Sequence, residues 1–262
     1  MAETRGSSLR LQHDRQHAIY MLALRQGSVD VGDLAQRYGV TTETIRRDLS
    51  ELQSRQLLRR VHGGAIPVER INHEPLVEAR DMVNAEEKLR IATVAVGEVP
   101  ERGSVIIDSG STGQRLAEVF PVERDVHVVT NSLITALTLS RRGIRDLTVL
   151  GGAVRTKRHA MVDEVTRSEL QHMAIDVLFM SCDGLSFQHG LTTPYREEHT
   201  IKRAMMERAR RVVALVDSSK FGNVQMFGFA SFDEIDVLIT DTGVDPEFVD
   251  LLGSHDITVH RA

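Results

Sequence analysis

After residue 104 the chain alternates short apolar runs with amphipathic segments, and this alternation limits the possible folds more than any other feature. A short apolar run fits a buried strand, while an amphipathic segment fits a helix with one buried face. Strands that alternate regularly with helices favour a parallel sheet covered by helices. The runs occur at residues 104–107, 126–129, 147–150, 177–180, 212–216, 237–239 and 257–259. The sequence therefore predicts an α/β fold over residues 85–262, with a Rossmann-like parallel sheet and helices on both of its faces.

The composition excludes several classes of protein. With one cysteine, Cys182, the chain cannot form an internal disulfide framework, and this usage fits a reducing cytoplasm. Residues 1–13 lack the apolar core of a secretory signal peptide, and we expect them to form a disordered tail. No run approaches the roughly 18 apolar residues of a membrane span. The 11 histidines show no metal-ligand spacing, so we expect no bound metal. We also expect a cytoplasmic protein with no cofactor and no membrane partner.

The net charge is unevenly distributed along the chain. Residues 1–70 hold eleven arginines, no lysine and eight acidic residues, a charge of +3, whereas the whole chain carries −5 and the remainder therefore −8. A basic segment joined to a larger acidic one indicates that only the first part meets a polyanion. Because +3 is modest, charge alone makes nucleic acid plausible and no more.

The first 70 residues also show the pattern of a winged helix. Three segments have helical spacing of apolar residues, and three to four residues separate the second from the third, which is the spacing of a helix-turn-helix. Gly39 fits the end of the second helix and Thr41 the N-cap of the third. Paired glycines at 63–64, between two apolar runs, predict a tight hairpin. We therefore expect a winged helix-turn-helix domain at residues 14–66 and a linker at 67–84, which holds two prolines.

The third helix of this domain is the candidate recognition helix. A helical wheel places Ile45, Leu49 and Leu52 on one buried stripe, so Arg46 and Arg47 both lie outside the core. In a major groove, one arginine can reach a base edge while the other meets a phosphate.

A helix taken alone would leave a second interpretation open, in which the arginines form a solvated face with Asp48 and Glu51 as partners. The preceding helix, the turn and the hairpin favour contact with double-stranded DNA. Hydroxyls and free N–H groups at the helix N-terminus can bind a backbone phosphate, and the arginines of the hairpin can straddle the phosphates. The predicted DNA contacts are Thr41, Thr42, Glu43, Thr44, Arg46, Arg47, Ser50, Arg59, Arg60, His62 and Gly63.

Small, polar and charged residues follow most of the predicted strands. In open parallel sheets, ligands bind outside the carboxyl ends of the strands. The loop at 108–113 is the best phosphate candidate, because its glycines allow close approach, its hydroxyls donate and the following helix offers its N-terminus. Lys220 follows another strand directly and is either a ligand contact or a surface lysine. The predicted effector contacts are Asp108, Gly110, Ser111, Thr112, Gly113, Asn131, Ser132, Asp183 and Lys220.

Several motifs are similar to those of one known family. The segment "GSVDVGDLAQRYGVTTETIRRDLSELQSRQLLRRVHGGA" resembles the N-terminal signature of DeoR-type transcriptional regulators, and the similarity continues through "DSGSTG", "VVTNSL", "VLGGAVR", "DGL…GLTTP…EEHTIKRAM" and "VALVDSSKFG". The resemblance implies an N-terminal winged helix and a C-terminal effector domain that is similar to ribose-5-phosphate isomerase and senses phosphorylated sugars or related metabolites. It also places Glu198 and Lys202 near the effector, although an i, i+4 pair also fits an ordinary helix salt bridge. The chain departs from the family at Gly113, where threonine is usual, and at Asp163, where glycine is common.

The rival class is a sugar-phosphate isomerase that carries a DNA-binding appendage. Such an enzyme needs an acid–base pair to move a proton between carbons, and the isomerase relatives carry further acids just beyond their "DG". Here Asp183 and Gly184 are followed by Leu185, Ser186 and Phe187, so we expect binding without catalysis. A DNA-binding structural protein without an effector would leave the polar strand ends unexplained.

We therefore predict a sequence-specific DNA-binding regulator, a repressor of carbohydrate catabolism genes that responds to a phosphorylated sugar or related metabolite. One winged helix with a charge of +3 would bind DNA weakly. Two such domains joined through their C-terminal domains gain avidity at paired half-sites. We expect a homo-oligomer, either a dimer or a tetramer.

Overall fold

The computed structural model describes residues 15–16, 18–20, 22–23, 28–54, 57–61, 63–67, 83–244, 246–253 and 255–262. The chain divides into two compact units, Met1–Val83 and Asn84–Ala262, which are described separately below. The predicted tail at 1–13, most of the predicted linker and the predicted DNA contact His62 lie outside the described residues.

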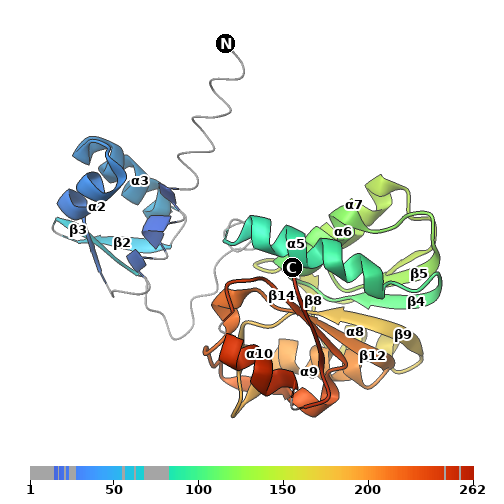
Figure 1. Cartoon of the computed structure of the whole chain (residues 1–262). Helices are drawn as coiled ribbons and strands as arrows, with labels where there is room; N and C mark the ends of the chain where they lie inside the picture. The colour runs from blue at the N-terminus through green and yellow to red at the C-terminus, as the bar shows by residue number, and fades with distance from the viewer. Residues whose placement is uncertain are drawn as a thin grey trace. The chain divides into compact units, whose positions relative to one another are not determined.

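The N-terminal unit is a winged helix-turn-helix, as its sequence predicts (Figure 1). Its turn is defined by Gly39, which ends the second helix with a φ of 62°, and by Thr41, whose hydroxyl accepts from the N–H of Thr44 at 3.2 Å. The wing also contains a third strand, which the sequence did not predict, and the three strands form an antiparallel sheet of order β1-β3-β2. The elements are helical residues between 15 and 23, β1 (Val29–Asp30), α2 (Val31–Tyr38), α3 (Thr42–Ser54), β2 (Leu58–Val61) and β3 (Gly64–Pro67).

The core of this unit contains the expected stripe of α3 and one carboxylate. Ile45, Leu49 and Leu52 are buried, as the helical wheel predicts. Asp48 is also buried, and it accepts hydrogen bonds from Arg15 Nε at 2.6 Å and Gln16 Nε2 at 3.0 Å. Asp48 therefore ties the first helix to the recognition helix and is not a partner of the exposed arginines on α3.

The second unit contains the predicted parallel sheet, with all seven expected strands in the order β15-β14-β12-β9-β4-β5-β6. The order reverses between β4 and β9, because β5 and β6 lie on one side of this pair and β12, β14 and β15 on the other. The strands are β4 (Arg102–Ile107), β5 (Asp125–Thr130), β6 (Leu147–Val149), β9 (Ile175–Met180), β12 (Ala209–Leu215), β14 (Val237–Thr240) and β15 (Thr258–Arg261).

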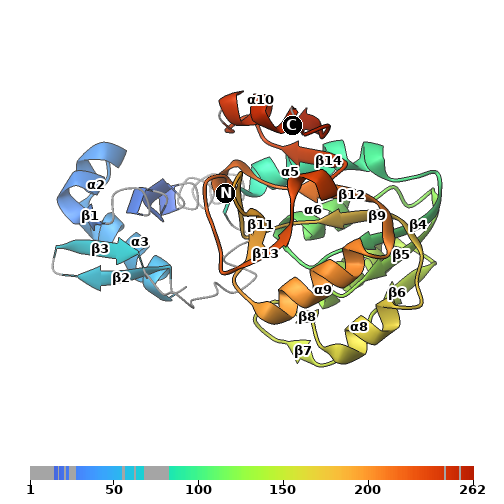
Figure 2. The ribbon, with the colours of Figure 1, turned by 90° about the horizontal axis from the view of Figure 1, so that it is seen from below.

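Helices cover both faces of this sheet (Figure 2). Successive strand residues point to opposite faces, so Val105 and Ile107 join one core while Ile106 joins the other. One core includes α5 (Ala85–Ala95), α6 (Ser111–Val119) and α7 (Leu133–Arg142), and the other includes α8 (Glu164–Leu170), α9 (Arg196–Met206) and α10 (Pro246–Gly253). No helix among the described residues is long and apolar enough to cross a membrane.

Two small antiparallel elements were not predicted, and both lie beside the candidate site. A hairpin, β7 (Val154–Arg155) and β8 (Ala160–Met161), connects β6 to α8. A three-stranded sheet consists of β10 (Gly184–Ser186), β11 (Gly190–Thr193) and β13 (Phe227–Ala230). These strands are short and rich in polar residues and glycine, so they lack the apolar alternation that predicts a strand. Short 3₁₀ turns complete the unit at η1 (Val96–Glu98), η2 (Ser218–Lys220) and η3 (Phe232–Glu234).

The close pairing of β1 with β3 predicts a specific intolerance at Gly64. A Cβ at this position would lie 2.0 Å from the carbonyl oxygen of Val29, so Gly64→Ala must push the strands apart. We expect a loss of roughly 1–3 kcal/mol in the unfolding free energy of the N-terminal unit, measured from its slowest amide hydrogen exchange. Gly39→Asn is the control, because Asn tolerates the left-handed backbone there and no atom lies within 4 Å of the added Cβ. Equal losses in the two variants would contradict this account.

Candidate functional site

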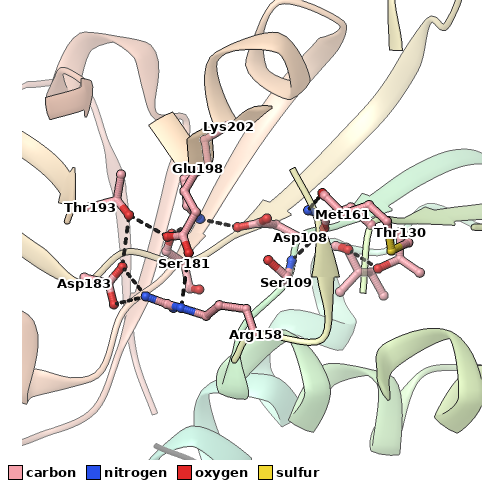
Figure 3. Close-up of polar contacts among 12 residues, drawn as sticks. Asp108, Ser109, Thr130, Arg158, Met161, Ser181, Asp183, Thr193, Glu198 and Lys202 are labelled. Carbon is pink, nitrogen blue, oxygen red and sulfur yellow. Dashed lines mark hydrogen bonds and ion pairs between the residues drawn. The ribbon is translucent and has the colours of Figure 1, made fainter. Parts of the chain in front are cut away.

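The candidate ligand site lies where the strand order reverses. Ligands bind at such a switch point, outside the carboxyl ends of the strands. Asp108 follows β4 directly, and Ser181–Asp183 follow β9, so these two adjacent strands deliver their polar ends to one place (Figure 3). The sheet thus brings together residues that are more than seventy positions apart in sequence.

A buried lysine joins the ends of these two strands. The ammonium group of Lys202, which comes from α9, donates to the Asp108 carboxylate and to the Ser181 carbonyl, the latter at 2.8 Å. Burial would lower the pKa of Lys202, but the carboxylates of Asp108 and Glu198 outweigh this effect and raise it. Lys202 therefore remains charged, although only 5% of its surface is exposed.

A second cluster surrounds Glu198, one helical turn before Lys202. Arg158 Nε and Arg155 Nη1 lie 3.2 and 3.1 Å from Glu198 Oε1. The Thr193 hydroxyl donates to Glu198 Oε2 at 2.6 Å. The pair Glu198 and Lys202 is therefore not mainly a helix salt bridge, since each residue has closer partners on other elements (Figure 3).

Asp183 belongs to the same cluster. Arg158 Nη2 lies 3.2 Å from Asp183 Oδ1, and the Thr193 hydroxyl lies 3.2 Å from Oδ2. Burial would raise the pKa of Asp183, but the charges of Arg158, Lys220 and Lys202 outweigh burial and hold this pKa below its ordinary value. Asp183 is thus held as a carboxylate.

The loop at 108–113 reaches this cluster from the β4 side. Gly110 has no room for a side chain, because a Cβ there would lie 2.6 Å from Ser181 Oγ. Ser111 and Thr112 are buried in the first turn of α6, and no side chain caps that turn. Uncapped N–H groups at a helix start favour an anion. A Cβ on Gly113 would lie 2.6 Å from the Asp108 carbonyl oxygen, so the threonine that is usual in the family does not fit this backbone.

Asn131 and Ser132, also predicted as effector contacts, support the loops of the site. Asn131 Oδ1 accepts from the Ser109 N–H at 3.0 Å, and its Nδ2 donates to the Met161 carbonyl at 3.0 Å. Ser132 caps α7, because its hydroxyl accepts from the Thr135 N–H at 3.2 Å. Asn131 thereby holds the 108–113 loop beside strand β8 of the hairpin that carries Arg158.

Lys220 lies in η2, directly after β12, and its charge lowers the pKa of both Asp183 and Asp217. Asp163 is the N-cap of α8. It accepts from the N–H groups of Val165 and Thr166 in α8 and, at 2.7 Å, from that of Ala153. These backbone bonds lower the pKa of Asp163, with the bond from Ala153 as the largest cause. In this structure the aspartate at position 163 holds a turn through the backbone bonds that it accepts.

Arg155, Arg158 and Thr193 also belong to the cluster and were not selected from the sequence. Asp217 was recognised as a polar residue after a strand but was not selected as an effector contact. The two arginines stand in "RTKRH", a basic cluster within a polar loop, and this was the available signal. Burial raises the pKa of the Cys182 thiol to about 12, so this residue is a neutral part of the core rather than a nucleophile.

The candidate DNA contacts form one exposed surface on α3 and the wing. Thr42, Glu43, Arg46, Arg47 and Ser50 are exposed on the helix, and Arg59 and Arg60 on β2. Arg46 lies 3.5 Å from Glu43. Arg60 Nη1 lies 3.3 Å from Ser50 Oγ, so the exposed surface of the wing contacts that of α3. Thr41 is exposed and Thr44 half-buried at the helix start, and Gly63 has a φ of 80° at the hairpin turn.

The buried pair of Lys202 and Asp108 predicts an asymmetric mutational pattern. Lys202→Met leaves a buried carboxylate without its partner, and we expect a loss of about 3–5 kcal/mol in the unfolding free energy. Combining Lys202→Met with Asp108→Asn should recover much of this loss, because no charge of the pair then remains buried. Urea unfolding of the full chain measures the unfolding free energy of the single and the double variant. Arg167→Met, which breaks an exposed 2.8 Å pair with Glu164, should stay within about 0.5 kcal/mol. A double variant no more stable than Lys202→Met would overturn this view of the pair.

Comparisons with known proteins match both units. The DeoR-like helix-turn-helix domain matches residues 15–70, and the DeoR C terminal sensor domain matches residues 83–242. The HTH-type transcriptional regulator GlpR of Haloferax volcanii is 34% identical over 249 residues, which cover 95% of this chain and 97% of that protein. The glycerol-3-phosphate regulon repressor of Escherichia coli K12 is 30% identical over 250 residues, 94% of this chain and 97% of that protein.

Solved structures that match part of the chain include ribose 5-phosphate isomerase A from Neisseria gonorrhoeae, at 18% identity and a TM-score of 0.38, over 51% of this chain and 52% of that chain. The E61V mutant of RipA has 12% identity and a TM-score of 0.45, over 64% of this chain and 52% of that chain. The assignment of this chain to a family rests on the two family matches and on the relatives that align over nearly their whole length. The chain belongs to the DeoR family of transcriptional regulators, with a helix-turn-helix DNA-binding unit followed by a sensor unit.

Proposed function

We propose that this regulator is a repressor of carbohydrate catabolism genes, and that a phosphorylated sugar or related metabolite controls it from the switch point of the sensor sheet. The observation that carries this proposal is the convergence of buried charged side chains and an uncapped helix N-terminus at one sheet edge. We further propose that it acts in the cytoplasm as a homo-oligomer, because paired DNA-binding units gain avidity at paired half-sites.

The phosphate of the effector is assigned to the Gly110–Gly113 loop. This loop offers two hydroxyls and the first-turn N–H groups of α6. The sugar hydroxyls are assigned to Asp183, Glu198 and Thr193, whose oxygens already share hydrogen bonds within the cluster. The name of the E. coli relative, a glycerol-3-phosphate regulon repressor, supports a phosphate ester as the class of effector.

Binding without catalysis is the third part of the proposal. An efficient general base has a pKa near the working pH. The pKa of Asp183 is held below its ordinary value, and Glu198 is engaged by Arg155 and Arg158. Leu185, which follows the "DG", is fully buried within β10 and supplies no acid. These groups are suited to hold hydroxyls rather than to exchange protons with carbon.

The placement of the phosphate predicts which variant loses the effector. A panel of sugar and polyol phosphates that includes glycerol 3-phosphate is tested by thermal shift, and a compound at 100 times its Kd should add about 2.7 kcal/mol of stability. Ser111→Asp places a negative charge where the phosphate would lie, so we expect the shift to be lost, while Ser140→Asp, at an exposed position on α7, keeps it. No member of the panel should undergo aldose–ketose exchange. If the compound gives Ser111→Asp the same thermal shift as the wild type, the phosphate binds elsewhere.

Different roles for Arg47 and Arg60 predict different losses on DNA. We assign Arg47 to a base edge and Arg60 to a phosphate, from their outward positions on helix and wing. With DNA selected from a random pool by binding, Arg47→Ala should cost roughly 1–3 kcal/mol on the selected sequence and relax the preference over random DNA. Arg60→Ala should weaken binding to the selected sequence and to random DNA alike. It should also reduce the slope of log K against the logarithm of the salt concentration by about one unit. Equal losses on selected and random DNA for Arg47→Ala would reject its assignment.

A further inference from the structure

The hairpin of β7 and β8 is fastened to one half of the sensor sheet. The Met161 N–H donates to the Asn131 carbonyl at 2.9 Å, and the Asn131 amide donates to the Met161 carbonyl at 3.0 Å. The Leu133 N–H donates to the His159 carbonyl at 2.9 Å. Asn131 and Leu133 lie directly after β5 and at the start of α7. The hairpin therefore belongs to the half of the sheet that contains β4, β5 and β6.

The two arginines of this hairpin reach across to the other half. Arg158 is almost fully buried, and its Nε and Nη2 each lie 3.2 Å from a carboxylate oxygen, of Glu198 and Asp183 respectively. Arg155 Nη1 lies 3.1 Å from Glu198, and the centre of its guanidinium lies 3.7 Å from the centre of the Tyr195 ring. Glu198 lies on α9 and Asp183 follows β9, so Arg158 spans the switch point (Figure 3).

The ion pairs at the switch point are balanced only because these arginines are present. Three carboxylates take part in the pairs, namely those of Asp108, Asp183 and Glu198. Three cations oppose them, which are Lys202 and the two arginines of the hairpin. The formal charge of this network is thus zero, and without the arginines it would be −2. A negatively charged ligand would be repelled by such a network, whereas a neutral ligand would not.

We infer that Arg155 and Arg158 are specificity-determining residues of the sensor, which make the switch point select a negatively charged ligand over a neutral one. This assignment rests on the proposed function, because it takes the switch point as the ligand site. The arginines act by neutralising the carboxylates that would bind sugar hydroxyls, while the loop at 110–113 receives the anion. At an effective dielectric constant of about 20, two unit charges roughly 10 Å apart interact strongly enough to change an affinity about tenfold.

The arginines could instead serve only to fasten the hairpin to α9. The two roles differ in what the substituting side chain must supply. Lysine keeps the positive charge of arginine but lacks its planar fork of donors, whereas glutamine keeps polar donors and loses the charge. If the charge matters, Arg158→Lys should retain anion binding and Arg158→Gln should lose it. If only the fastening matters, the two variants should bind an anion alike.

The test uses inorganic phosphate alone, so it needs no identified effector. The thermal shift of the full chain is titrated with phosphate at constant ionic strength. Only the saturable part of the shift is counted, because phosphate also stabilises proteins without binding to a site. We expect Arg158→Gln to raise the Kd for phosphate at least about tenfold, and Arg158→Lys to stay close to the wild type. The matched control is Lys157→Gln, which removes one positive charge from the same hairpin at an exposed position and should leave the Kd unchanged.

Arg155→Gln is the second variant, because Arg155 is only half-buried and its loss threatens folding less than that of Arg158. It should also bind phosphate more weakly than Lys157→Gln does. The inference is overturned if the folded arginine-to-glutamine variants bind phosphate as tightly as Lys157→Gln, or if the wild type shows no saturable shift.

Failure of the proposed function has a different outcome. In that case phosphate binds the wild type and Arg158→Gln weakens it, but no sugar or polyol phosphate changes the affinity for the selected DNA. Such a result would leave the role of the arginines intact and reject the proposed class of effector. If glycerol 3-phosphate does bind, its advantage over glycerol should shrink in Arg158→Gln and persist in Lys157→Gln. An undiminished advantage in Arg158→Gln would also overturn the inference.

Discussion

The sensor unit depends on charge held inside an apolar fold. Asp108 ends the central strand β4 in a place where burial penalises its charge, and Lys202 supplies the compensating ammonium from a helix on one face of the sheet. Burying one such charge alone would be costly, so the two residues need each other. Because the lysine also donates to the Ser181 carbonyl at the end of β9, the pair fixes the two strands at the switch point and the mouth of the proposed ligand site at the same time.

Both units bury charged side chains, but the buried charges have different partners in each unit. In the helix-turn-helix unit, the buried carboxylate Asp48 joins two helices through Arg15 and Gln16 and leaves the outer face of α3 free for polar residues. In the sensor unit, several carboxylates and cations share one cluster, in which Arg158 contacts both Asp183 and Glu198. The first arrangement stabilises a scaffold, while the second keeps hydrogen-bonding groups gathered at a sheet edge.

Much of the fold was predictable because its signals are local. Strands such as 177–180 are continuous apolar runs, and the stripe of Ile45, Leu49 and Leu52 follows from helical periodicity. From the residues alone, the site was predictable where a polar residue stands at or just beyond the end of a strand, as Asp108 does after β4 and Asp183 after β9. Glu198 and Lys202 on α9 were predicted only from the family resemblance. Arg158 could not be placed from the sequence, because its position depends on the pairing of β7 with β8 and on the bond between Asn131 and Met161, which are tertiary contacts. The role of Asp48 was missed for the same reason.

The origin of Arg155 and Arg158 in a short hairpin has a consequence for how such sensors diversify. The hairpin contributes no strand to the seven-stranded sheet, so changes in its residues leave the order and register of that sheet intact. Loops on a rigid scaffold tolerate substitution and insertion better than the scaffold does. Substitutions among the six residues at 154–159 can therefore change the contacts made to Asp183 and Glu198, while the pair of Lys202 and Asp108 stays in place.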